Sequence, residues 1–126
     1  MDKMGVTVMN EKLIINTKQL MEITEEARLQ YVNRTQLDTY EVDFYGEVKP
    51  FADRALALLK EWEPLAKEWV IENKPKYLYP IQIKNTYENL EMVSVIAWQK
   101  DTGPKKFNER VQSIEYVLEK ILEQTE

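Results

Sequence analysis

The sequence contains no cysteine, no histidine and only three glycines, so its side chains lack the groups on which many kinds of site depend. Without cysteine there is no disulfide, thiolate zinc site, iron–sulfur cluster or thiol nucleophile. Without histidine there is no Ser-His-Asp arrangement and no Glu-x-x-His pair of the kind that builds di-iron bundles. Three isolated glycines do not supply the glycine-rich loops that bind phosphates. We therefore name no catalytic, cofactor-binding or metal-binding residue, and we expect a protein that is not an enzyme.

The chain also lacks a net positive charge and a long apolar run. The net charge is −5 and the isoelectric point is near 5.0, which argues against a binder of nucleic acid. The most apolar run, MVSVIAW at 92–98, is far shorter than the roughly 20 residues of a membrane-spanning helix. The first ten residues, MDKMGVTVMN, lack the basic and then apolar pattern of a signal peptide. We expect a cytoplasmic protein that does not bind membranes.

The composition is that of a helix-rich globular protein. The chain has 126 residues, of which 44% are hydrophobic and 31% charged, with five prolines. This length suits a single domain over residues 1–126. Four segments have helical periodicity, and three short breaks rich in turn residues separate them. We expect residues 1–9 to form a frayed extension.

The first segment carries one apolar stripe and is expected to be helical over about residues 10–34. The stripe consists of Leu13, Leu20, Ile23, Ala27 and Tyr31. Thr17 and Thr24 lie beside it, where each hydroxyl can bond the carbonyl one turn earlier.

The second segment keeps a 3.5-residue period across two prolines, Pro50 and Pro64. Its apolar positions are Phe44, Val48, Phe51, Ala55, Leu58, Trp62, Leu65 and Trp69. Gly46, four residues before Pro50, leaves room for the backbone to bend. We predict one long helix over 43–73, capped by the Asp43 carboxylate and kinked near Pro50. Lys60 precedes Pro64 by four residues, so a second kink at Pro64 stays open, and a break there, with a new helix beginning at Pro64, is the alternative.

The third and fourth helices have clear boundaries. Pro80 suits the first turn of the third helix, and the stretch DTGP at 101–104 stops that helix and begins the next. The apolar positions of the third helix are Ile83, Tyr87, Leu90 and Ala97, and those of the fourth are Phe107, Val111, Ile114, Leu118 and Ile121. Short connections make sequential helices antiparallel neighbours, so we predict an all-α, up-down-up-down antiparallel four-helix bundle.

Several stretches together resemble the YppE-like family of small bacterial proteins. They are LIINTKQLMEITEEARLQY at 13–31, VDFYGEVKP at 42–50, Trp62, KPKY at 74–77 and QIKNTYENLE at 82–91. The resemblance covers about residues 13–122 and implies a four-helix bundle of unassigned function. The extension before Asn10 is a departure from the family. Relatives carry histidines near the end of the third helix, where this chain reads SVIAWQKDTG at 94–103, so a metal role based on them would not carry over.

Carboxylates at helical spacing are the first candidate for chemistry. They are Glu22 with Glu25 and Glu26, and Glu88 with Glu91. Two such groups facing each other could hold magnesium or manganese through oxygen ligands. None lies on an apolar stripe, and di-metal bundles usually need histidine as well, so we favour a solvated acidic face.

The second candidate is an aromatic and basic patch where the second and third helices meet. Lys74, Lys76, Tyr77 and Tyr79, with Trp62, form a candidate interaction patch for an acidic peptide, a phosphate or a nucleotide. The structural alternative is that the tyrosine rings close the core at the bundle end. A second basic cluster, Lys100, Lys105, Lys106 and Arg110, is expected at the opposite end.

Three tryptophans, Trp62, Trp69 and Trp98, are predicted to lie in the core, although an exposed ring could anchor a partner. Our leading hypothesis is a non-catalytic protein-interaction or regulatory module with an unidentified protein partner. The alternative is a binder of small molecules or ions, or an enzyme that uses carboxylates and tyrosine, with a pocket near the bend, beside Trp62 or Tyr87. Self-association through helix faces is a third hypothesis.

Overall fold

The computed structural model describes the backbone of residues 3–126 and the side chains of residues 10–126. The elements are α1 (Lys3–Gln30), a π-helical turn η1 (Tyr31–Thr35), a second π-helical turn η2 (Phe44–Val48), α2 (Lys49–Asn73), α3 (Pro80–Ile96) and α4 (Pro104–Thr125). The described part of the chain contains no β-strand. None of its helices is long and apolar enough to cross a membrane.

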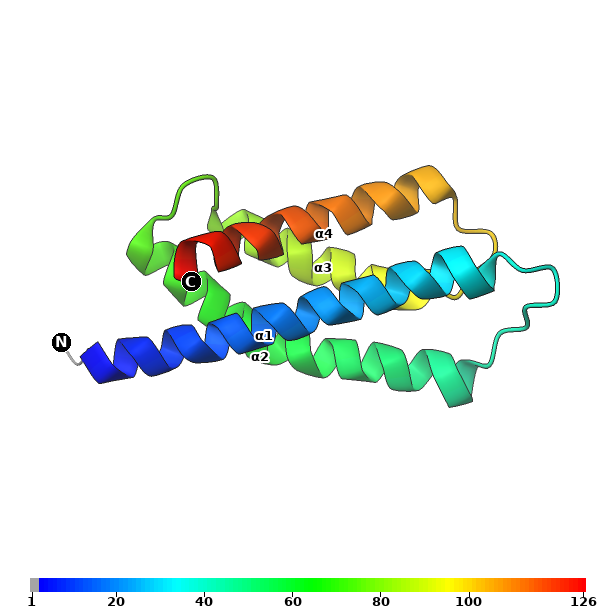
Figure 1. The fold of residues 1–126 in the computed structure, drawn as a ribbon, viewed down its shortest axis with the longest axis horizontal. Coiled ribbons are helices and arrows are strands. Elements are labelled where there is room, and N and C mark those ends of the chain that lie inside the picture. The colour runs from blue at the N-terminus through cyan, green and yellow to red at the C-terminus, as the bar shows by residue number, and fades with distance from the viewer. Residues whose placement is uncertain (1–2) are drawn as a thin grey trace.

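The four long helices form an antiparallel bundle (Figure 1). Both α1 and α3 pack against α2 and α4. The α1–α2 and α3–α4 connections lie at one end of the bundle, and the α2–α3 connection lies at the other end with the C-terminus (Figure 1). The predicted all-α, up-down-up-down fold is confirmed.

Helix α1 has the predicted apolar stripe but begins at Lys3, earlier than the expected start at Asn10. All five predicted residues of the stripe are buried, including Leu20 and Ala27, which have no exposed surface. The Thr24 hydroxyl donates to the Leu20 carbonyl at 2.8 Å, as predicted. Of the expected frayed extension, residues 1–2 and the side chains of 3–9 lie outside the described residues.

The start of the second helix is capped by Asp43, as predicted. The Asp43 carboxylate accepts a hydrogen bond from the Gly46 amide at 2.9 Å. The distortion expected near Pro50 is a π-helical turn, in which the Val48 amide donates to the Asp43 carbonyl at 3.1 Å. The role of Gly46 differs from our expectation, because a Cβ there would lie 2.2 Å from the Asp43 carboxylate. The glycine therefore makes room for the cap rather than for a bend.

Helix α2 continues through Pro64, so the alternative of a break at that proline is wrong. The helix changes direction along its length, as Figure 1 shows, and an interior proline is a common cause of such a bend. Its core also differs from the predicted pattern: Leu58 and Leu65 are only partly buried, while their neighbours Leu59 and Ala66 have no exposed surface.

A network of polar side chains holds the α1–α2 connection. Arg34 binds the Glu47 carboxylate through both terminal nitrogens, at 2.9 and 3.2 Å, and donates to Gln30 at 2.8 Å. The buried Thr35 hydroxyl accepts from Gln30 at 3.1 Å and donates to the Ala97 carbonyl at 2.6 Å. This network joins the end of α1 and η1 to η2 and to the end of α3.

The last two helices begin where the prolines predicted, with Pro80 and Pro104 in their first turns. The five apolar positions predicted for α4 are all buried. Trp98 is buried as predicted, and its indole nitrogen donates to the Ser94 carbonyl at 3.1 Å.

Candidate functional site

The connection between α2 and α3 has an unusual backbone conformation. Lys74 ends α2 in the left-handed region, with φ 46°, and its amide donates to the Val70 carbonyl at 3.0 Å. Tyr77 is also left-handed, with φ 65°, although it is not a glycine. A non-glycine residue in this region is strained and stays there only when its surroundings hold it.

Hydrogen bonds to α4 and α3 provide that support. The Lys76 amide donates to the side chain of Gln124 at 3.1 Å, and the Gln124 amide donates back to the Lys76 carbonyl at 2.8 Å. The Tyr79 amide donates to the Gln82 side chain at 2.7 Å, where α3 begins. Leu78 lies between these bonds and is buried in the core. The α2–α3 connection is therefore held by α4, by the start of α3 and by the burial of Leu78 in the core.

Both tyrosines of the connection point outward. Tyr77 is 65% exposed and Tyr79 is 63% exposed, so Leu78, and neither tyrosine, closes the core at this end. The hollow around them has a volume of about 550 Å3. Apart from Pro80, which begins α3, we call the exposed residues that line this hollow the loop surface: Ile71, Lys74, Lys76, Tyr77 and Tyr79. The loop surface combines aromatic rings, an isoleucine and two ammonium groups on a fixed backbone.

Four of the five residues of the predicted patch are thus brought together, and the fifth is not. Trp62 has no exposed surface, and its indole nitrogen donates to the Thr17 hydroxyl at 3.0 Å in the core. Its ring is packed in the core, which confirms the core position predicted for the three tryptophans. It has no surface to offer a partner or a ligand, so its two other interpretations, as an interaction residue and as the wall of a pocket, are wrong.

A second hollow adjoins the loop surface. The Lys120 ammonium lies 6.0 Å from the Tyr77 ring centre and 5.6 Å from that of Tyr116. The ion pair of Lys120 with Glu123, at 3.2 Å, raises the pKa of this lysine. Tyr116 lines the second hollow and Tyr77 belongs to the loop surface, so Lys120 lies where the two hollows meet.

This second hollow runs between α3 and α4 and has a volume of about 510 Å3. We call it the α3–α4 groove. Its exposed or partly exposed polar lining is Gln82, Asn85, Asn89, Glu109, Gln112, Ser113 and Tyr116. Beyond Asn89 it meets a smaller hollow, of about 320 Å3, which Lys106 and Arg110 line. Arg110 donates to the Asn89 side-chain oxygen at 2.9 Å, which holds the two helices together across the groove.

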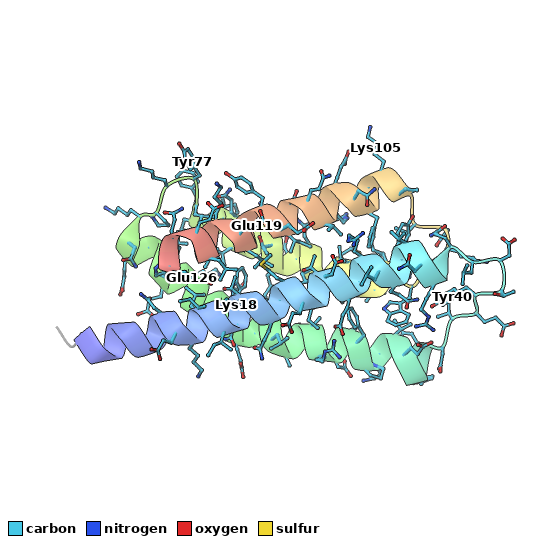
Figure 2. The ribbon with its side chains drawn as sticks, in the orientation of Figure 1. Lys18, Tyr40, Tyr77, Lys105, Glu119 and Glu126 are labelled. Carbon is cyan, nitrogen blue, oxygen red and sulfur yellow. The ribbon has the colours of Figure 1, made fainter. Side chains whose placement is uncertain are left out.

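The predicted second basic cluster lies at the other end of the bundle from the loop surface. Figure 2 shows Lys105 at the start of α4, far from Tyr77. Lys100 donates to the Asp38 carbonyl at 3.3 Å, which ties it to the α1–α2 connection.

The predicted acidic groups lie on the surface. Glu25 pairs with Arg28 at 2.6 Å, and the hydrogen bond from this guanidinium lowers the pKa of Glu25. Glu26 pairs with Arg54 of α2. Glu22, Glu88 and Glu91 are exposed. Among the residues that the structure describes, no group of three or more acidic side chains is placed to hold a metal ion.

Sequence reasoning did not find Ile71, Lys120, Tyr116 or the α3–α4 groove. The amides at positions 82, 85 and 89 recur at helical spacing, which is a usable signal for one wall. The opposite wall can be assigned only when the packing of α3 on α4 is known.

Comparison with known proteins gives a family match over most of the chain. Residues 17–125 match a bacterial domain of unknown function, DUF1798. The chain belongs to this family. Among solved structures, a Listeria innocua protein of unknown function is 28% identical, with a TM-score of 0.88 and coverage of 94% of each chain. This agrees with the resemblance seen in the sequence.

Two further DUF1798-like structures share the fold. A DUF1798 protein of Staphylococcus aureus, MW1337, is 25% identical, covering 90% of this chain and 96% of that one, with a TM-score of 0.81. YppE from Bacillus subtilis is 22% identical, covering 88% and 89% of the two chains, with a TM-score of 0.81. The comparison with curated proteins gives no match.

Proposed function

We propose that this DUF1798 protein is a non-catalytic interaction module of the cytoplasm, which binds a partner protein through the loop surface. The observation that carries the proposal is the pair of exposed rings, Tyr77 and Tyr79, on a backbone held by hydrogen bonds to α3 and α4. Tyrosine rings are common binding anchors because they offer large contact areas and lose little conformational entropy when bound.

The backbone of Tyr77 supports the same conclusion. A left-handed tyrosine is strained by about 1–3 kcal/mol, and such strain gathers at binding and catalytic sites. Here the strain places an aromatic ring next to Lys76 and Lys120, where the ring and the two ammonium groups form one surface. A partner with an acidic and apolar contact region suits this surface.

The proposal can be tested by photo-crosslinking in the native cytoplasm. A photoreactive phenylalanine is placed at position 77 in one variant and at position 45 in a second. Tyr45 is a matched control, because it is 81% exposed and lies in η2, at the opposite end of the bundle. We expect an adduct of defined mass from position 77 and none of that mass from position 45.

A second variant makes the test specific. Adding Lys76→Glu and Tyr79→Ala to the position-77 variant should abolish the adduct, since both side chains belong to the loop surface. Circular dichroism should show an unchanged fold, because both residues are exposed. Equal adducts from positions 77 and 45, or an adduct that survives the second variant, would contradict the proposal.

A further inference from the structure

We propose that the α3–α4 groove binds an extended segment of the partner polypeptide, with carboxylates toward its two ends. This inference rests on the proposed function, since the groove adjoins the loop surface through Lys120.

The side-chain amides of the groove are suited to a peptide backbone. Asn85 and Gln112 come from opposite walls, and both are exposed. A carboxamide carries donors and an acceptor, so it can pair with the carbonyl and the amide of a peptide unit. Peptide units are the same in every sequence, and side chains of this kind can therefore hold a backbone in place without demanding one residue type.

The dimensions of the groove favour an extended segment. The α3 wall runs from Gln82 to Asn89, and the α4 wall with its basic extension runs from Lys106 to Tyr116. At 1.5 Å per helical residue these walls are about 10 and 15 Å long. An extended chain rises about 3.3 Å per residue, so roughly three to five residues fit along the groove.

Positive side chains at the two ends of the groove favour carboxylates near the two ends of the segment. Lys120 lies where the groove meets the loop surface, and Lys106 and Arg110 lie at the far end. Glu109 lies next to Arg110 and lines the smaller hollow with it and Lys106, so its carboxylate reduces the positive charge of the far end without cancelling it. At one end Glu123 already pairs with Lys120, so an incoming carboxylate there joins this pair rather than meeting a free ammonium.

Tyr116 adds an aromatic contact beside Lys120. Its side chain is 44% exposed and lines the groove. An apolar or aromatic residue of the segment can pack on this ring while the neighbouring backbone pairs with the amides.

The experiment begins with a phage library of random decapeptides selected on the full-length protein. The peptides that are enriched should carry acidic residues three to five positions apart. One of these peptides is then labelled, and its affinity for variants is measured by fluorescence anisotropy. Asn85→Ala and Gln112→Ala should each weaken binding about tenfold, the usual effect of losing a directional hydrogen bond at a binding site.

Two further variants complete the design. Asn108→Ala is the matched control, because Asn108 is an exposed amide of α4 outside the groove, and it should leave the affinity unchanged. Glu109→Gln should strengthen the binding of the acidic peptide, because it removes a negative charge beside Lys106 and Arg110. Loss of folding would not produce such an increase in affinity.

The outcomes separate this inference from the proposed function. Failure to enrich any peptide, or binding that is equal in Asn85→Ala, Gln112→Ala and the parent protein, overturns the groove inference. An adduct at position 77 with the expected controls would still support the loop surface in that case. Peptide binding that depends on Asn85 and Gln112, without any adduct at position 77, would retain the groove and overturn the loop surface.

Discussion

The hydrogen bond between Trp62 and Thr17 is one of the few polar contacts within the core of the bundle. The indole nitrogen and the hydroxyl are 3.0 Å apart, and neither residue has exposed surface. A buried donor that loses its partner costs about 1–3 kcal/mol, because it has also lost its water. The pairing therefore stabilises one arrangement of α1 against α2.

Thr17→Val should consequently destabilise the protein by about 1–3 kcal/mol, because the isosteric valine leaves the Trp62 nitrogen unpaired. Thr24→Val is the matched control. Its hydroxyl donates only to the Leu20 carbonyl within the same helix, so its removal should cost less. Urea denaturation followed by circular dichroism measures both free energies of unfolding. Equal losses for the two variants would show that the Trp62 contact adds nothing.

Gly46 permits a second local interaction, the cap by Asp43. Gly46→Ala should lower the free energy of unfolding by about 1 kcal/mol, because its Cβ would displace the capping carboxylate. In an Asp43→Ala background there is no carboxylate to displace, so the same substitution should be neutral or stabilising. The measurement is a double-mutant cycle by urea denaturation. Additive losses would contradict the steric explanation.

At the scale of elements, α2 buries a wider apolar stripe than a heptad seam, because it packs against both α1 and α3. A helix at the core of a bundle commonly buries a third apolar position beside the two of the seam. In α2 this third position is occupied by Leu59 and Ala66, which have no exposed surface. The seam residues Leu58 and Leu65 pack at its edge.

Leu59→Ala should therefore destabilise the protein more than Leu58→Ala. Truncation of a fully buried leucine costs about 2–5 kcal/mol, because it removes buried surface and leaves a cavity. Leu58 is partly exposed, so its truncation should cost less. Thermal unfolding by calorimetry gives the order of the two variants, and an inverse order would favour the simple heptad seam.

These elements also show how far the sequence determines the fold. The apolar positions predicted for α1 and α4 are all buried, because polar residues fill most of the positions between them. In α2 the residues at 58, 59, 65 and 66 are all apolar, so only packing decides which of them lie deepest. The π-helical turns were not predicted, because no residue type marks an extra residue in a turn.

Part of the candidate site could likewise be predicted from the sequence, and part could not. Lysines and tyrosines between two prolines indicated the loop surface, since such a stretch must lie outside the helices. Trp62 was misplaced there because an aromatic residue on a predicted seam suits both a core and an anchor. The α3–α4 groove was missed because its amides and Glu109 look like ordinary solvent-facing positions in each helix taken alone.

At the scale of the whole molecule, the packing of α4 on α1 brings like charges together. Burial raises the pKa of Glu115, and the carboxylates of Glu119 and Glu25 raise it further, while Arg28 opposes them. A carboxyl whose pKa is raised in the folded state binds more protons there than in the unfolded chain. Stability is therefore lost as the pH rises from the ordinary value of 4.5 through the raised pKa.

Glu115→Gln should increase the free energy of unfolding at neutral pH and reduce its decrease above pH 4.5, because the neutral amide does not ionise. Urea denaturation at a series of pH values measures this dependence. Glu61→Gln is the control, since Glu61 is an exposed carboxylate of α2 outside this group of charges. A variant with the same pH dependence as the parent would contradict the assignment to Glu115.

The paired hydrogen bonds of Gln124 to Lys76 join residues that are 48 positions apart in the chain. The order of the α2–α3 connection is thereby linked to the last turn of α4. Gln124→Ala should let Tyr77 leave its left-handed conformation, so that backbone 15N relaxation shows lower order parameters over 76–79 and unchanged values within α2. An affinity tag that disturbs the final turn of α4 would have the same effect, and could conceal a partner from any binding screen.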